Sequence, residues 1–262
     1  MLAEELIALT DAAREAPPFT DRYPALTAAE GYGAARALHR HRVSRGWKPL
    51  GRKIGFTNRT IWSRYGVYEP IWGTVYDRTL AYARDGRTEI ALAGLLNPRI
   101  EPEICFGLRS APRAASVDAL LEAIDWVAHS IEIVQSPFPA WKFKLADCTA
   151  VNGLHGRLLI GERAPLHELP QLAAALPKLS VELLRNGEPV DRGLGANVLD
   201  SPLAALGHLV EVLGRQPEAP PLAPGEVIST GTITDAHPVR PGETWGTRLA
   251  GLPLRGLTVR FR

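Results

Sequence analysis

The chain has few of the residues that build covalent cross-links, and it carries little net charge. It contains two cysteines, Cys105 and Cys148, and neither belongs to a CxxC pattern. Both lie among apolar residues, so we expect buried free thiols in a reducing compartment. The formal net charge is +2, and the basic residues form no run interleaved with aromatic residues. These absences disfavour a disulfide-stabilised secreted domain and a nucleic-acid partner.

Long apolar runs and several well-known catalytic motifs are also missing. No apolar stretch approaches the roughly 20 residues that a helix needs to cross a bilayer. The start, Met-Leu-Ala-Glu-Glu, lacks the basic and apolar regions of a signal peptide. We therefore expect a cytoplasmic protein with no membrane partner. The chain has no GxGxxG, P-loop, GxSxG or HExxH motif, which disfavours nucleotide binding and serine-hydrolase chemistry.

The composition is that of an ordinary globular protein, and the chain divides into two parts with different sequence patterns. The 262 residues are 45% hydrophobic and 22% charged, enough to bury a substantial core. Residues 1–48 read as an N-terminal helical segment, with one amphipathic helix over 2–15 and a second over about 27–45. Thr27 and Glu30 form a capping box at the start of the second helix. Residues 49–262 read as a β-rich catalytic domain.

Short β-like runs separated by glycine and proline dominate the second part. We predict strands at 52–57, 129–134, 179–184 and 257–261, with a hairpin turn at Asn186-Gly187. Helical patterns cover 116–127 and the stretch from Asp200 to Gly214. Residues 62–77 and 141–156 read as long loops without regular structure. The chain is therefore predicted to have an α+β fold.

The most informative stretch is Arg-Ile-Glu-Pro-Glu-Ile-Cys-Phe, residues 99–106. On a strand, Glu101 and Glu103 would point to one side, while Ile104 and Phe106 would pack on the other. Glu132 lies inside a second apolar run, residues 129–134. Three carboxylates from two strands would make an oxygen site for Mg²⁺ or Mn²⁺. The alternative is that these glutamates lie on the solvated face of a sheet.

Other polar residues each allow two interpretations. Lys53 sits between apolar and small residues, which favours a lowered pKa or an anionic partner, unless the side chain points to water. Asp77 is either a catalytic or a turn aspartate. Residues 141–156 gather Asp, Asn, His and Gly, as binding loops often do. Within them, His155 is either a proton carrier near neutral pH or a structural histidine.

Taken together, the ordered segments resemble the 2-keto-4-pentenoate hydratase branch of the fumarylacetoacetate hydrolase superfamily, which also contains 4-oxalocrotonate decarboxylases. The matching pieces span nearly the whole chain. They are the helical lead-in and residues 51–57, 73–77, 99–104, 130–134, 141–156 and 229–232. The resemblance implies a mixed β-roll of the fumarylacetoacetate hydrolase C-terminal-domain type behind an N-terminal helical segment, assembled as a homo-oligomer.

The resemblance also implies a set of site residues. Glu101, Glu103 and Glu132 would match the ligands of Mg²⁺ or Mn²⁺. The substrate would be a 2-oxo acid, whose enolate form the cation stabilises as a Lewis acid. Lys53 and Asp77 match polar positions beside the substrate, and Asn152, Gly231 and Thr232 match substrate-binding positions. His155 does not match a family residue, but we include it among the candidate catalytic residues as a proton carrier.

The implied activity is a metal-dependent hydro-lyase reaction, the addition of water to a 2-hydroxy-2,4-dienoate in aromatic compound catabolism. Decarboxylation of an oxalocrotonate-like diacid is the alternative, for which Arg59 or Arg64 could bind the second carboxylate. An inactive partner subunit is a third possibility. The chain departs from the family at Val151, an expected Asp, and at His155, a serine-type position. Residues 58–68 lack the His-x-x-Glu pair of the carbon–carbon hydrolases.

Overall fold

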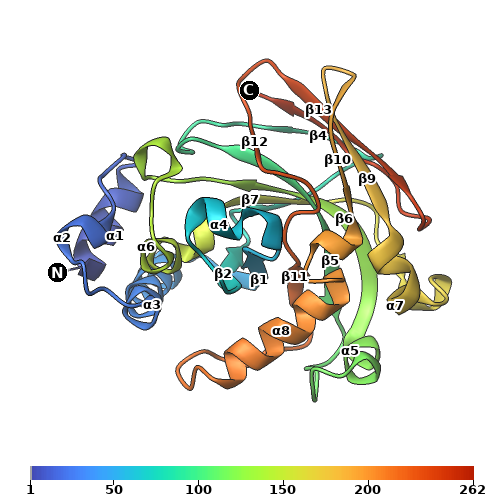
Figure 1. Cartoon of the computed structure of the whole chain (residues 1–262), viewed down its shortest axis with the longest axis horizontal. Helices are drawn as coiled ribbons and strands as arrows, with labels where there is room; N and C mark the ends of the chain where they lie inside the picture. The colour runs from blue at the N-terminus through green and yellow to red at the C-terminus, as the bar shows by residue number, and fades with distance from the viewer. Residues whose placement is uncertain (1) are drawn as a thin grey trace.

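The computed structural model describes residues 2–262, apart from the side chains of Ile61, Arg64 and Tyr65. Two sheets lie against each other, with helices at one end and along one side (Figure 1). The helices are α1 (Leu2–Asp11), α2 (Phe19–Arg22), α3 (Ala28–Ser44), α4 (Trp62–Tyr65), α5 (Val117–Ala123), α6 (Leu145–Ala150), α7 (Leu172–Ala175) and α8 (Pro202–Gly214). Among the described residues, no helix is both long and apolar enough to cross a membrane.

The larger sheet has nine strands and is mixed. Its main path runs β2-β1-β11-β5-β6-β7-β3, with β12 beside β5 and β8 beside β6. Pairs β1/β11 and β3/β7 are parallel, and the other pairs are antiparallel. The strands are β1 (Pro49–Gly55), β2 (Ile71–Tyr76), β3 (Leu80–Tyr82), β5 (Arg99–Leu108), β6 (Ile124–Val134), β7 (His155–Ile160), β8 (Ala164–Pro165), β11 (Val227–Ser229) and β12 (His237–Pro238).

The smaller sheet has five strands in the order β10-β9-β13-β14-β4. The pair β14/β4 at one edge is parallel, and the other pairs are antiparallel. The turn between β9 and β10 is Asn186-Gly187, and both residues have positive φ, as a tight hairpin requires. The strands are β4 (Arg87–Ile90), β9 (Ser180–Arg185), β10 (Glu188–Leu194), β13 (Thr244–Ala250) and β14 (Thr258–Phe261).

Three apolar clusters connect these layers. Between the sheets, Ile131 and Ile133 of β6 pack with Trp245 and Phe261 of the smaller sheet. Helices α5 and α8 cover another part of the larger sheet, and Ile104 and Phe106 belong to that cluster, as predicted. A third cluster joins residues of β2, β5, β6, β7 and β11 alone. The larger sheet therefore curls around its own interior, in agreement with the predicted β-roll.

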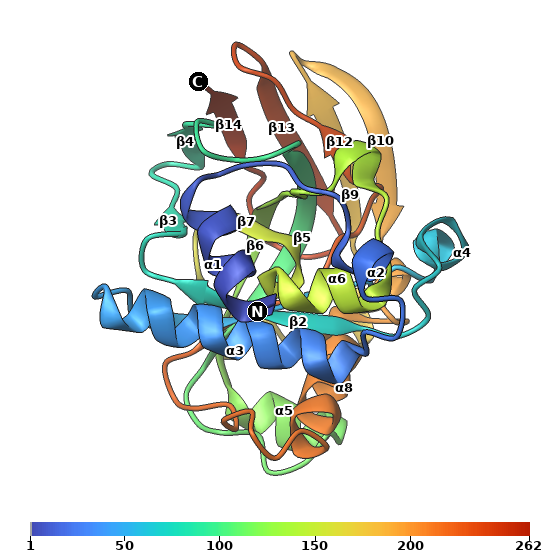
Figure 2. The ribbon, with the colours of Figure 1, turned by 90° about the vertical axis from the view of Figure 1, so that its left-hand side faces the viewer.

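The N-terminal helices lie across one end of the roll. Figure 2 shows α3 running in front of β2, with α1 and α6 above it. The predicted capping box is present, because Thr27 accepts from the backbone of Glu30 while the Glu30 carboxylate accepts from the Thr27 backbone. Gly31 allows a close approach between helices: a Cβ there would lie 2.1 Å from Thr149 Oγ1 of α6. The helical segment is thus packed against the loop region 141–156.

Several element predictions need correction. The helix predicted over 116–127 ends at Ala123, because residues from Ile124 onward join the long strand β6. The two predicted loops contain regular structure, namely β2 in the first and α6 in the second. β2 forms by pairing with β1, and α6 packs against the N-terminal helix α3; local patterns do not reveal either contact.

A buried histidine links the two sheets and provides a test of the fold. His129 on β6 has its Nδ1 2.9 Å from the Glu103 carbonyl and its Nε2 2.8 Å from Thr247 Oγ1 on β13. Burial lowers the pKa of His129 from 6.5 to about 4. The ring is therefore neutral in the folded protein at pH values where the unfolded chain already binds a proton.

We predict that this histidine makes the protein acid-sensitive. The folded pKa is depressed, so the unfolded state binds more protons between pH 6.5 and 4, and stability falls as the pH falls through that window. The free energy of unfolding should drop by about 3 kcal/mol more in the wild type than in His129→Leu. Urea unfolding in EDTA at the two pH values measures this difference, and parallel pH slopes for the two proteins would contradict it.

Candidate metal centre

Two neighbouring strands bring three glutamates together. Glu101 lies directly across from Glu132 in the antiparallel pair β5/β6, and Glu103 lies two residues further along β5. One carboxylate oxygen from each residue lies within 4.8 Å of the other two. Glu103 and Glu132 are fully buried, and Glu101 is partly buried. The structure thus excludes the solvated-face alternative for Glu103 and Glu132.

Lys53 is the cationic side chain in direct contact with this cluster, and the charge of Arg99 lowers the pKa of Glu101. Lys53 on β1 is buried, with its Nζ 3.1 Å from Glu132 Oε2 and 3.0 Å from the Gly153 carbonyl oxygen. Burial would lower the pKa of Lys53, but the charges of Glu132, Glu101 and Glu103 raise it on balance. Of the two interpretations for a buried lysine, the structure therefore shows the anionic partner.

The negative charge of the three carboxylates exceeds the positive charge next to them. Burial, the largest cause, raises the pKa of Glu101 and of Glu103 to about 8, and it also raises the pKa of Glu132. Repulsion from neighbouring carboxylates adds to the effect at Glu101 and Glu103, whereas Lys53 opposes it. Three carboxylates facing one ammonium leave room for further positive charge.

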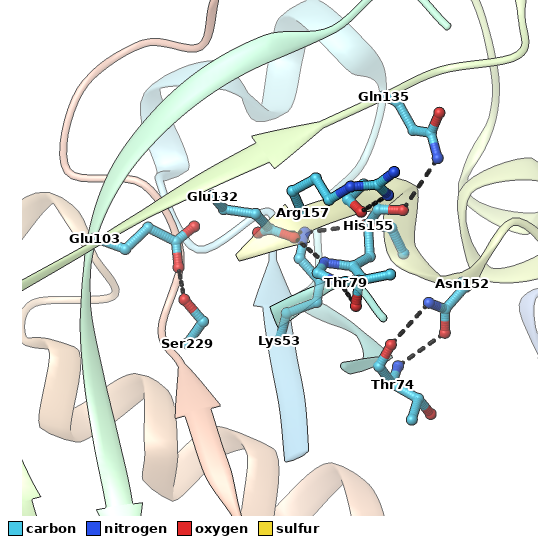
Figure 3. A network of polar contacts seen from close by, with 12 residues as sticks. Lys53, Thr74, Thr79, Glu103, Glu132, Gln135, Asn152, His155, Arg157 and Ser229 are labelled. Carbon is cyan, nitrogen blue, oxygen red and sulfur yellow. Dashed lines mark hydrogen bonds and ion pairs between the residues drawn. The ribbon is translucent and has the colours of Figure 1, made fainter. Parts of the chain in front are cut away.

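Ser229, the last residue of β11, and Gly231, just beyond the strand, hold the side chain of Glu103 in place. Its Oε2 accepts from Ser229 Oγ at 2.5 Å (Figure 3) and from the Gly231 backbone N–H at 2.9 Å. Gly231 has φ +97°, and a Cβ there would lie 1.9 Å from Thr57 Oγ1, so only glycine fits.

The donor set suits a hard divalent cation. The other Glu103 oxygen, Oε1, is buried without a hydrogen-bond partner among the described residues. A buried carboxylate oxygen left unpaired is costly unless a cation binds it. The nearby ligand atoms are all carboxylate oxygens, which Mg²⁺ and Mn²⁺ prefer over the nitrogen and sulfur ligands typical of zinc. The residues present therefore fit such a metal.

A cavity opens onto this cluster. Lys53, Glu101, Gly231 and Thr232 supply its polar part, and aromatic and aliphatic side chains supply much of the rest. The apolar lining residues are Phe56, Val134, Trp141, Phe143, Leu154 and Ala236.

The predicted substrate-binding residues occupy different positions. Gly231 and Thr232 line the cavity, although the Thr232 hydroxyl donates to the Thr234 carbonyl at 2.9 Å. Asn152 instead pairs its side-chain amide with the Thr74 backbone, accepting at 2.8 Å and donating at 2.9 Å. Both polar groups of Asn152 are thus used to fasten the loop to β2. The structure does not support direct substrate binding by this residue.

Asp77 lies away from the carboxylates. Lys53 pairs with Gly73 of β2, whereas Asp77 follows the end of that strand and is exposed. The Asp77 carboxylate accepts from the backbone N–H groups of Lys48 and Arg78. The turn-aspartate alternative therefore describes this residue, and its position does not support a role in proton transfer.

His155 contacts the cluster through Glu132 and does not line the cavity described above. Its Nδ1 lies 2.7 Å from Glu132 Oε1, and the ring is absent from the lining of that cavity. Burial lowers the pKa of His155 well below its ordinary value, with Lys53 and nearby arginines acting in the same direction. The ring is therefore neutral near pH 7, and the structure does not support a proton carrier.

The two arginines considered for a second carboxylate are not part of the described cavity lining. Arg59 forms an ion pair with Asp200 at 3.0 Å, and both side chains are largely exposed. The Arg64 side chain lies outside the described part of the chain.

Sequence reasoning missed two polar residues of the site. Ser229 was within a segment that resembled the family, but its contact with Glu103 depends on pairing between β11 and β5. Thr79 carried no signal, and its contact with His155 joins residues 76 positions apart.

Comparison with known proteins places the chain in a family. Residues 79–259 match the family described as fumarylacetoacetate (FAA) hydrolase C-terminal, and the chain belongs to this family. The resemblance and fold expected from the sequence are thereby confirmed.

Individual relatives cover most of the chain. A 2-hydroxyhexa-2,4-dienoate hydratase of Comamonas testosteroni is 31% identical over 92% of this chain and 89% of its own length. A 4-oxalocrotonate decarboxylase of Pseudomonas sp. (strain CF600) is 32% identical over 90% of this chain and 87% of its own. The solved 4-oxalocrotonate decarboxylase from Pseudomonas putida G7, complexed with magnesium and adipate, has a TM-score of 0.89 at 29% identity and covers 100% and 96% of the two chains. The prediction of an enzyme is confirmed.

We predict that Glu103→Gln loses metal binding. The change keeps shape and the ability to accept hydrogen bonds but removes the charge that pairs with a cation. Mn²⁺ affinity should fall by more than the roughly 10–100-fold that loss of a supporting residue costs. Calorimetric titration with MnCl₂ measures the affinity. Glu89→Gln, an exposed strand position, is the matched control, and equal affinities in the two variants would contradict the prediction.

Proposed function

We propose that the protein is a divalent-metal-dependent hydratase that adds water to a 2-hydroxy-2,4-dienoate. The observation that carries this proposal is the cluster of three carboxylates, two of them fully buried, next to Lys53 at a cavity with a largely apolar lining. The hydratase relatives at about 30% identity support the same reaction. Under this proposal Glu101, Glu103 and Glu132 are the metal ligands, and the metal is Mg²⁺ or Mn²⁺.

The chemistry needs a group that stabilises the enolate form of a 2-oxo acid. A bound cation would supply Lewis acidity to the substrate's carboxylate and keto oxygens. The residues of the chain then have to orient the substrate and handle its protons. Hydration proceeds by tautomerisation of the dienol to an unsaturated ketone, followed by addition of water at the far end of the conjugated system.

Lys53 is the residue in the cavity with a proton to give. Its raised pKa keeps it protonated near neutral pH, and its Nζ lies beside the carboxylates rather than on the protein surface. We assign it the delivery of a proton to the substrate carbon chain and its recovery afterwards, as a general acid–base group. Gly231 and Thr232 also line the cavity, where they can contact the substrate carboxylate.

The apolar part of the cavity favours a substrate with one carboxylate. Phe56, Trp141 and Phe143 contribute to it, and Lys53 is the only cationic side chain among the described lining residues. A second carboxylate placed against these aromatic rings would lose its hydration without gaining a partner. A hydrocarbon diene tail would be buried favourably there.

Decarboxylation of 4-oxalocrotonate is the second candidate function. The resemblance to the decarboxylase from Pseudomonas putida G7, with its TM-score of 0.89, favours it. The reaction would use the same carboxylates and the same enolate stabilisation. It differs in needing a cation for the second carboxylate, and Arg59 is already paired with Asp200.

We further propose that the protein is cytoplasmic, forms a homo-oligomer and acts in aromatic compound catabolism.

We predict metal-dependent consumption of 2-hydroxypenta-2,4-dienoate. Loss of its ultraviolet absorbance is followed with Mg²⁺, with Mn²⁺ and with EDTA, and the product is identified as a 4-hydroxy-2-oxo acid. 4-Oxalocrotonate is tested in parallel for release of carbon dioxide. Turnover of the diacid alone would replace the hydratase by the decarboxylase, and turnover of neither with metal present would contradict both.

We also predict that Lys53→Met separates catalysis from metal binding. Removing a general acid–base group costs roughly 10²–10⁴-fold in kcat. Mn²⁺ affinity should be unchanged or higher, because a positive charge next to the carboxylates is lost. Lys48→Met, at an exposed position, serves as the control. A variant that keeps wild-type kcat would show that Lys53 has no role in proton transfer.

A further inference from the structure

A continuous hydrogen-bond chain ends on Glu132. Starting from the strand β2, the Tyr76 backbone N–H lies 3.1 Å from Thr79 Oγ1, and that oxygen lies 2.8 Å from His155 Nε2. The other ring nitrogen, Nδ1, lies 2.7 Å from Glu132 Oε1 (Figure 3). Tyr76, Thr79, His155 and Glu132 are all buried.

The directions of these bonds follow when Glu132 is ionised, as a metal ligand is. The carboxylate can then only accept, so Nδ1 of His155 donates to it. In the neutral ring Nε2 carries no proton and accepts from the Thr79 hydroxyl, whose other acceptor within reach is the Tyr76 carbonyl at 3.1 Å. The Thr79 oxygen in turn accepts from the Tyr76 N–H, which can only donate. Every polar group is satisfied with one imidazole tautomer, and both ring nitrogens are occupied by protein partners.

This arrangement fixes how the Glu132 carboxylate is turned. With Oε1 held by His155, the other oxygen, Oε2, is directed toward Lys53 and the remaining carboxylates. His155 does not line the cavity that opens onto the three carboxylates. It lines a different small cavity, together with Arg42 and Gln135. His155 therefore cannot reach a substrate held at the carboxylates and acts only through Glu132.

We propose that His155, held in one tautomer by Thr79, is a positioning residue that presents Glu132 Oε2 to the divalent cation. This inference rests on the metal-dependent function proposed above. The imidazole suits the task because it bonds Oε1 alone and leaves Oε2 facing Lys53 and the other carboxylates. Without it, Oε1 would be left buried and unpaired, and the carboxylate could rotate away from the ligand position.

The test compares Mn²⁺ binding by the metal-free protein and three variants, followed by electron paramagnetic resonance of free Mn²⁺. His155→Leu removes both bonds at similar volume and should weaken binding by roughly 10–100-fold. His155→Asn places an amide N–H close to the position of Nδ1 and should restore most of that loss. Thr79→Val removes the donor to Nε2 and should weaken binding by less than His155→Leu.

His129→Leu is the matched control, because His129 is an equally buried histidine that bonds the backbone carbonyl of Glu103 and the Thr247 hydroxyl, and no ligand carboxylate. It should bind Mn²⁺ like the wild type. Wild-type affinity in His155→Leu, an equal loss in both leucine variants, or no recovery in His155→Asn would each overturn the inference. If His155→Leu does not fold, an unchanged affinity in Thr79→Val overturns it. A wild-type protein that binds no Mn²⁺ would instead refute the metal-dependent function itself.

Discussion

The arrangement of this protein depends on burying three carboxylates next to one another. Their oxygens lie within 4.8 Å, and the described part of the chain provides one ammonium, that of Lys53, in contact with them. Such a cluster is unfavourable in the metal-free protein, as the raised pKa values of Glu101 and Glu103 show. A fold that retains it must hold each carboxylate rigidly from outside, and the surrounding elements do so.

The two fully buried carboxylates are supported by different parts of the chain. Ser229 at the end of β11 and Gly231 just beyond it hold Glu103, and the chain through Thr79 and His155 holds Glu132. The N-terminal helices contribute indirectly. They pack on α6, and the loop that follows α6 supplies the Gly153 carbonyl that accepts from Lys53. The pairing of Asn152 with the β2 backbone keeps that loop in place.

The sequence predicted the parts of the site that depend on local geometry. Glu101 and Glu103 share a face because strand residues two apart always do, and the pairing of β5 with β6 then brings Glu132 to them. The roles predicted for Asp77, Asn152 and His155 came from resemblance and loop composition. Their contacts depend on where β2 and residues 141–156 meet, which no local pattern encodes. The same holds for β2 itself, whose glycine and aromatic residues read as a loop although it pairs fully with β1.

The central claim is that the buried carboxylates form a divalent metal site. The most direct measurement is a crystal structure of the protein grown with Mn²⁺ and oxalate, with diffraction collected at the manganese absorption edge. The account predicts one anomalous peak within ligand distance of Glu101, Glu103 and Glu132, with oxalate beside it in the cavity next to Lys53. An anomalous map with no peak at the three carboxylates, at a Mn²⁺ concentration that saturates binding in solution, would contradict it.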